Sequence, residues 1–148
     1  MTNCTFCKIL SGSLSSSKVY EDENVMAFLD IHPISDGHTL IIPRRHIESL
    51  TTLSLKEVAR IAQIGQVVAT HLKRVLPECQ GITLSLADGI AAGQEVPHAH
   101  LHVIPRQEGD GFGWKFPPNY SGVATEREKL DAIAEHLRES IYTEEHTS

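Results

Sequence analysis

The stretch PHAHLHVIPR, from Pro97 to Arg106, decides the fold, because its histidines stand at every second position. His98, His100 and His102 alternate with small or apolar residues. A period of two is typical of a β-strand, whose successive side chains point to opposite faces. The pattern therefore predicts a strand over residues 98–104 with one apolar face and one face of imidazoles.

The segments around this strand predict an α+β fold on a mainly antiparallel sheet. Strand-like runs occupy 18–21, 25–29, 38–43 and 81–86, and short turns join several of them. One helix begins at the capping box of Ser54 and Glu57 and ends before Pro77. A second helix is expected over about 125–141, with another capping box at its start. Because a single helix separates 38–43 from 81–86, a doubly wound parallel sheet is not expected.

Composition limits the classes of protein to which the chain can belong. With 148 residues, we expect one domain spanning 1–148. The net charge of −6 opposes broad nucleic-acid binding, which needs a basic surface. The sequence has neither a signal-peptide pattern nor an apolar run of about 18 residues, so no membrane partner is expected. Three cysteines do not make a disulfide framework, and we expect a cytoplasmic protein with reduced thiols.

Two kinds of chemistry fit the face of histidines. Imidazoles two residues apart on a strand can chelate a zinc ion that keeps an open position. Alternatively, one neutral histidine attacks phosphorus while its neighbours bind the phosphate oxygens. The preceding loop favours the second, since Gly89, Gly93 and the peptide groups of 94–96 can turn N–H groups toward an anion.

The N-terminal segment carries a separate pair of candidate metal ligands. Cys4 and Cys7 have the C-x-x-C spacing of zinc ligands, which supplies half of a tetrahedral site. His46 and His98 are the candidates for the other half. The alternatives are two thiols without a metal and, less favoured by the sequence context, a redox pair.

Three segments identify a resemblance to a known family: CTFCKI, FLDIHPISDGHTLIIPRRHI and AGQEVPHAHLHVIPR. Together they resemble the histidine-triad (HIT) family, and within it the Hint-type branch with an N-terminal zinc-binding C-x-x-C. The likeness runs from Cys4 to Arg106. It implies a HIT-like fold, which is a five-stranded, mainly antiparallel sheet with two principal helices, usually as a homodimer.

The resemblance also implies an enzyme that acts on purine nucleotides. The expected reaction is hydrolysis or transfer of purine nucleoside 5'-phosphoramidates or adenylates through a nucleotidyl-histidine intermediate. His100 would be the nucleophile, His102 would contact the phosphate, and His38 would support them. The alternatives are a dinucleoside polyphosphate hydrolase and a nucleotide- or zinc-binding regulatory protein without catalysis.

The family pattern assigns further binding residues. Asp30 would accept the ribose hydroxyls, although an aspartate there could also cap a turn. The other substrate-binding residues would be Phe28, Ile31, Gln94, Glu95 and Val96. Zinc (Zn²⁺), structural and not required for the chemical step, would be bound by Cys4, Cys7, His46 and His98.

Two positions depart from the family pattern. An asparagine usually lies some residues before the Gly-Gln pair, where this chain has Ala87 and Asp88. Pro97 replaces an aromatic or aliphatic residue and removes an N–H group, which places the start of the strand at an edge or a turn.

Overall fold

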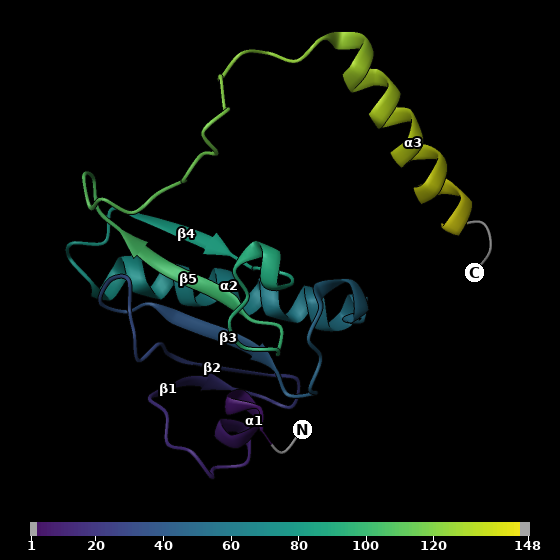
Figure 1. Ribbon diagram of the computed structural model, residues 1–148. Coiled ribbons are helices and arrows are strands. Elements are labelled where there is room, and N and C mark those ends of the chain that lie inside the picture. The colour runs from purple at the N-terminus through teal and green to yellow at the C-terminus, as the bar shows by residue number, and fades with distance from the viewer. Residues whose placement is uncertain (1–2, 146–148) are drawn as a thin grey trace. The chain divides into compact units, whose positions relative to one another are not determined.

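The computed structural model describes residues 3–145 (Figure 1). Its five strands and two longer helices follow the order expected from the sequence, and α1 and two short 3-10 helices are additional. These are α1 (Thr5–Leu10), β1 (Lys18–Glu21), β2 (Val25–Leu29), β3 (Thr39–Pro43), η1 (Leu50–Thr52), α2 (Leu55–Val75), β4 (Gly81–Ser85), η2 (Ile90–Ala92), β5 (Leu101–Arg106) and α3 (Arg127–Glu145).

The five strands form one sheet in the order β1-β2-β3-β5-β4. Every neighbouring pair is antiparallel, which confirms the predicted α+β class. The histidine strand β5 lies inside the sheet, between β3 and β4. This position fixes the strand from both sides and holds its side chains in a defined register.

Both faces of the sheet are covered over β2 and β3, so these two strands are mainly apolar. Val25, Ala27 and Ile41 belong to the cluster packed against α2, which runs across the sheet in Figure 1. Met26 and Phe28 point to the opposite face, where they pack with α1. A strand buried on both faces reads as a continuous apolar run, as VMAFL and TLIIP do.

The histidine strand follows the same division between the two faces. Ala99, Leu101 and Val103 belong to the cluster on the α2 face. The rings of His98 and His100 instead contact Phe6 of α1 on the other face. The imidazole face predicted from the alternation is therefore the face that α1 covers.

Helix α2 begins as predicted and packs closely on β5. The Ser54 side chain accepts the Glu57 N–H, and the Glu57 carboxylate accepts the Ser54 N–H, which completes the capping box. Gly65 lets the helix approach the strand, since a Cβ there would lie 2.9 Å from Leu101 Cδ2.

Two elements, β5 and α3, have boundaries that differ by two or more residues from those predicted. The ladder of β5 begins at Leu101 rather than at residue 98, because the Ala99 N–H donates to the Ile47 carbonyl in the loop after β3. His98 and His100 thus precede the strand, although they keep its alternation. The C-terminal helix begins at Arg127 and continues to Glu145, past the predicted end at 141.

The described chain divides into two compact units, and the second begins at Gly113. The first contains the sheet, α1 and α2, while the second contains α3. The expectation of one domain over 1–148 stays a prediction. Among the described residues, no helix combines the length and the apolar character needed to span a membrane.

Candidate functional site

The hydrogen bonds of His100 fix which of its ring nitrogens carries the proton. Its Nδ1 lies 2.7 Å from the His98 carbonyl oxygen. A carbonyl oxygen only accepts, so Nδ1 bears the proton, and Nε2 has a free lone pair. The ring is 5% exposed and is therefore held in a fixed orientation. In this tautomer, His100 presents at Nε2 the lone pair that the predicted nucleophile requires.

A second chain of hydrogen bonds orients His102. The Ile34 N–H donates to His38 Nδ1 over 3.1 Å, so the proton of His38 is on Nε2. That Nε2–H then donates to His102 Nδ1, 2.8 Å away. His102 consequently carries its own proton on Nε2, which can donate to an anion. The rings of His100 and His102 are neighbours, with centroids 4.9 Å apart, and one carries a lone pair on Nε2 while the other carries a donor.

Burial favours the neutral forms of His38 and His102. Burial lowers the pKa of His38, although the carboxylate of Asp30 partly opposes this effect. Burial, together with smaller effects of charge on His100 and His38, lowers the pKa of His102 to about 4. Protonation of His38 would remove the Nδ1 lone pair that accepts the Ile34 N–H. The hydrogen bonds that fix the tautomers of His38 and His102 therefore require that His38 is neutral.

The four predicted zinc ligands lie together beside this site. The two sulfur atoms and two ring nitrogens of Cys4, Cys7, His46 and His98 are all within 4.8 Å of one another. His98 Nδ1 is 3.6 Å from Cys4 Sγ and 3.8 Å from Cys7 Sγ. His46 Nδ1 is 3.3 Å from Cys7 Sγ. Zinc bonds of about 2.0–2.3 Å give tetrahedral edges of roughly 3.3–3.8 Å, and these distances agree with that range.

The protonation state of His98 also fits a metal ligand. Its Nε2 lies 2.8 Å from the Pro43 carbonyl, so Nε2 carries the proton and the Nδ1 lone pair faces the sulfurs. Such a carbonyl partner is typical of zinc-binding histidines. Burial and the neighbouring Cys4 thiol raise the pKa of the Cys7 thiol. A divalent cation would offset this effect and favour the thiolate.

A second group of metal-ligand types lies around His38, but its protonation does not suit a metal. Donor atoms of Asp30, His38 and His102 also lie within 4.8 Å of one another. The His38 nitrogen that faces the other two is Nε2, the one that the Ile34 N–H forces to carry the proton. A protonated nitrogen cannot bind a metal ion, so the group is a hydrogen-bond relay.

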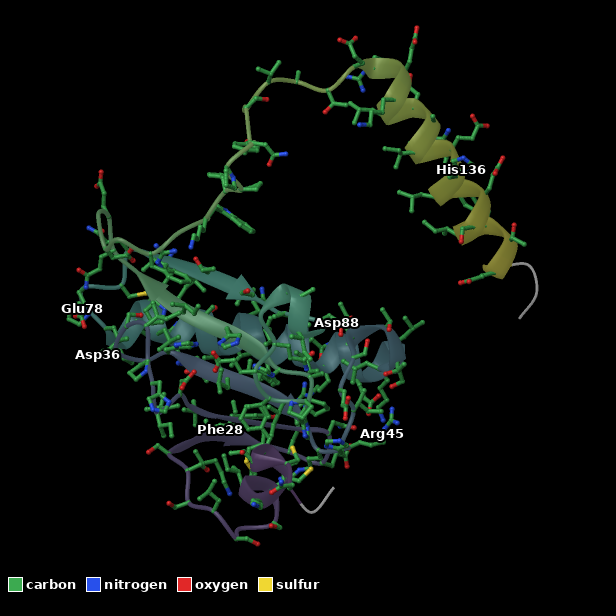
Figure 2. All side chains as sticks on the ribbon, in the orientation of Figure 1. Phe28, Asp36, Arg45, Glu78, Asp88 and His136 are labelled. Carbon is green, nitrogen blue, oxygen red and sulfur yellow. The ribbon has the colours of Figure 1, made fainter. Side chains whose placement is uncertain are left out.

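The residues predicted to bind the nucleoside lie in β2 and in the loop that follows it. Phe28, labelled in Figure 2, is buried and contacts the ring of Phe6 at 5.5 Å. Asp30 Oδ1 accepts the His32 N–H, so the residue does cap a turn. Its Oδ2 lies 3.7 Å from His38 Nε2, which brings the carboxylate to the relay. Ile31 is 84% exposed, so its side chain is accessible for contact with a base or sugar.

The glycine-rich loop before the triad is braced by Gln94. Its Nε2 donates to the Glu48 and Val96 carbonyls, and its Oε1 accepts the Gly89 N–H. Gly89 and Gly93 have φ of +88° and +86°, values that L side chains rarely adopt. In the described part of the chain, no hydrogen bond uses the N–H groups of Glu95 and Val96. The loop thus offers two backbone donors for an anion.

Other charged residues near these loops have structural partners. Arg45 pairs with Glu57 and Arg44 with Glu21, so their charges are balanced within the protein. Asp88 accepts from the Ser49 hydroxyl and the Leu50 N–H, which ties the glycine-rich loop to the segment before α2. Both Arg45 and Asp88 are labelled in Figure 2.

Sequence reasoning missed three contributors to the site. The Ile34 N–H and the Pro43 carbonyl are backbone groups, so residue identity does not indicate that they fix ring protons of His38 and His98. Phe6 contacts both His98 and His100, and its only signal is its place between the two cysteines.

Comparison with known proteins defines the class to which this fold and triad belong. The family model described as HIT domain matches residues 11–109. The chain therefore belongs to the HIT family.

Individual relatives agree over most of the chain. A HIT family protein from Bacillus anthracis has 40% identity and a TM-score of 0.82, over 93% of this chain and 96% of that one. A Zn-bound histidine triad family protein from Mycobacterium smegmatis has 40% identity and a TM-score of 0.72, over 80% and 85%. An adenosine 5'-monophosphoramidase from Candida albicans is 33% identical over 145 residues, 94% of this chain and 91% of that protein.

Proposed function

We propose that this protein is a nucleotidyl hydrolase of the Hint-type branch, which cleaves purine nucleoside 5'-phosphoramidates or adenylates. The pair of fixed tautomers carries the proposal: a free lone pair on His100 Nε2 and an N–H donor on His102 Nε2 are carried by neighbouring rings. The monophosphoramidase relative from Candida albicans supports this choice of substrate.

The reaction would take place in two displacements at the α-phosphorus. His100 Nε2 attacks phosphorus, and the bond to the leaving group breaks as the P–N bond forms. The imidazole then carries positive charge, which the His98 carbonyl stabilises through the Nδ1–H. His102 and the N–H groups of Glu95 and Val96 would hold the phosphate oxygens. Water next attacks phosphorus and breaks the P–N bond, which releases the nucleoside monophosphate and restores His100. The proton that water loses balances the proton that the departing amine of a phosphoramidate takes up in the first step.

The substrate-recognition roles follow from the placement of the remaining residues. Asp30 Oδ2 would accept a ribose hydroxyl, while Oδ1 holds the turn. Phe28 and Ile31 would contact the base and sugar.

The four-residue cluster would bind structural zinc through Cys4 Sγ, Cys7 Sγ, His46 Nδ1 and His98 Nδ1. Its geometry fits, and the relative from Mycobacterium smegmatis is Zn-bound. The ion would link α1 to the segment that carries the triad, and it would not take part in the reaction at phosphorus. Because thiolate ligands must stay reduced, we place the protein in the cytoplasm.

We also propose a homodimer. The apolar stripe of α3 is exposed in the single chain, and Leu137 and Ile141 have exposed fractions of 58% and 54%. Continuous apolar surface of this kind marks a protein interface. Sedimentation equilibrium should give twice the mass of the chain, and a monomer would contradict this part of the proposal.

A substrate panel tests the function. We expect AMP release from an adenosine 5'-phosphoramidate and its loss in His100→Gln. His71→Gln, which changes an exposed histidine on α2, is the matched control and should keep the rate. Faster cleavage of a dinucleoside polyphosphate would favour that alternative, and nucleotide binding without turnover would favour a regulatory protein.

A further inference from the structure

Phe6 contacts both the candidate metal cluster and the predicted nucleophile. It lies in α1 between Cys4 and Cys7, and its side chain is 5% exposed. Its ring contacts the rings of three other residues in edge-to-face geometry, and these belong to the metal cluster, the nucleophile and the nucleoside pocket. The centroid distances are 5.8 Å to His98, 5.1 Å to His100 and 5.5 Å to Phe28.

The contact with His100 is the shortest of the three and has an interplanar angle of 81°. The Nδ1–H bond to the His98 carbonyl holds one edge of the imidazole. A single hydrogen bond leaves the ring free to tilt about the axis through that bond. The Phe6 ring closes the space on the α1 side and restricts this tilt, because close-packed aromatic pairs have a preferred geometry.

We propose that Phe6 is a positioning residue for the nucleophile, and that α1 holds its ring against His100. The cysteines on either side of Phe6 would anchor the helix. The metal cluster thereby determines the orientation of His100 Nε2 without contacting the substrate. This inference rests on the proposed function for its kinetic consequence. Its geometric part, the orientation and tautomer of His100, is independent of that function.

The test compares Phe6→Leu with Ile42→Val in the zinc-loaded protein. Ile42 is fully buried in the same apolar cluster as Phe6, and it has no ring contact with His100. Both substitutions remove core atoms, but only the first removes the ring beside the nucleophile. Phe6→Met, whose flexible side chain fills irregular space, serves as a second variant if Phe6→Leu does not fold.

Three quantities are measured: steady-state kinetics with an adenosine 5'-phosphoramidate, zinc per chain, and the ¹⁵N signals of His100. Misplacing a reacting group by about 1 Å costs up to about 100-fold in rate, so we expect kcat of Phe6→Leu to fall about 10- to 100-fold. KM should change much less than kcat, and the zinc content should stay the same. The ¹⁵N spectrum should show His100 purely as the Nδ1–H tautomer in the wild type and as a tautomer mixture in Phe6→Leu.

Other outcomes separate this inference from the proposed function. An unchanged kcat and tautomer in Phe6→Leu would overturn the positioning role. Equal losses of kcat in Phe6→Leu and Ile42→Val would also overturn it, because they would show a general packing effect. If the wild type itself releases no AMP, the proposed function fails, and the ¹⁵N signals alone decide the role of Phe6.

Discussion

The neutral, buried state of His102 predicts a specific loss of stability in mild acid. Burial lowers the pKa of His102 from its ordinary value near 6.5 to about 4. Between these values the unfolded chain binds a proton that the folded protein does not, so stability falls by about 1.4 kcal/mol per pH unit. The contribution is fully present above pH 6.5 and is lost as the pH falls toward 4. At pH 5 the loss from this residue is about 2 kcal/mol.

The assay is urea unfolding of the wild type and His102→Asn between pH 7 and pH 5. The substitution removes the titrating ring, so the stability of His102→Asn should decline less steeply than that of the wild type. The difference between their free energies of unfolding should therefore shrink by about 2 kcal/mol at pH 5. Burial also lowers the pKa of His98, whose contribution is present in both proteins and cancels. His38 is hydrogen-bonded to His102, so the difference between the two curves reports this pair of histidines. His71→Asn, at an exposed position on α2, should follow the wild type. Parallel curves for wild type and His102→Asn would refute the argument that His102 is held neutral.

Three further predictions concern the metal cluster and the frame of the site. Replacing both Cys4 and Cys7 with serine should reduce zinc from about one per chain to near zero, as measured by metal analysis. It should also lower the free energy of unfolding by on the order of 4 kcal/mol when free zinc is about 1,000 times Kd. Retained zinc would contradict the proposed ligands. Gly37→Ala should destabilise the fold by about 1–3 kcal/mol in urea unfolding, because φ is +88° and a Cβ would lie 2.7 Å from Leu76 Cδ1. Ser54→Ala should cost about 1 kcal/mol by the same assay through loss of the α2 capping box, and an unchanged midpoint would contradict that role.

The sheet was predictable from the sequence because its pattern is strong and local. The runs VMAFL and TLIIP become β2 and β3, and the alternation after Pro97 separates apolar and histidine faces as expected. The first helix was not predicted, because α1 has only six residues and no apolar period of its own. The start of β5 was misplaced because a loop carbonyl, that of Ile47, takes the Ala99 N–H.

The types of residue in the site were readable from the sequence, but their protonation was not. Sequence motifs brought the histidines and cysteines into consideration. The assignment of each ring proton needed the backbone groups that face it, namely the carbonyls of Pro43 and His98 and the N–H of Ile34. These groups come from segments distant from the triad, or from within it, and only the fold brings them into contact. The same holds for Gln94, which braces its loop through three hydrogen bonds.

The central claim is that His100 forms a covalent bond to phosphorus, and the stereochemistry of hydrolysis tests it most directly. The measurement uses an adenosine 5'-phosphoramidate with sulfur in place of one non-bridging oxygen, in a single configuration, hydrolysed in ¹⁸O-labelled water. Two successive in-line displacements, the first by His100 and the second by water, predict net retention of configuration at phosphorus. Inversion would show that water attacks phosphorus directly and would contradict the account.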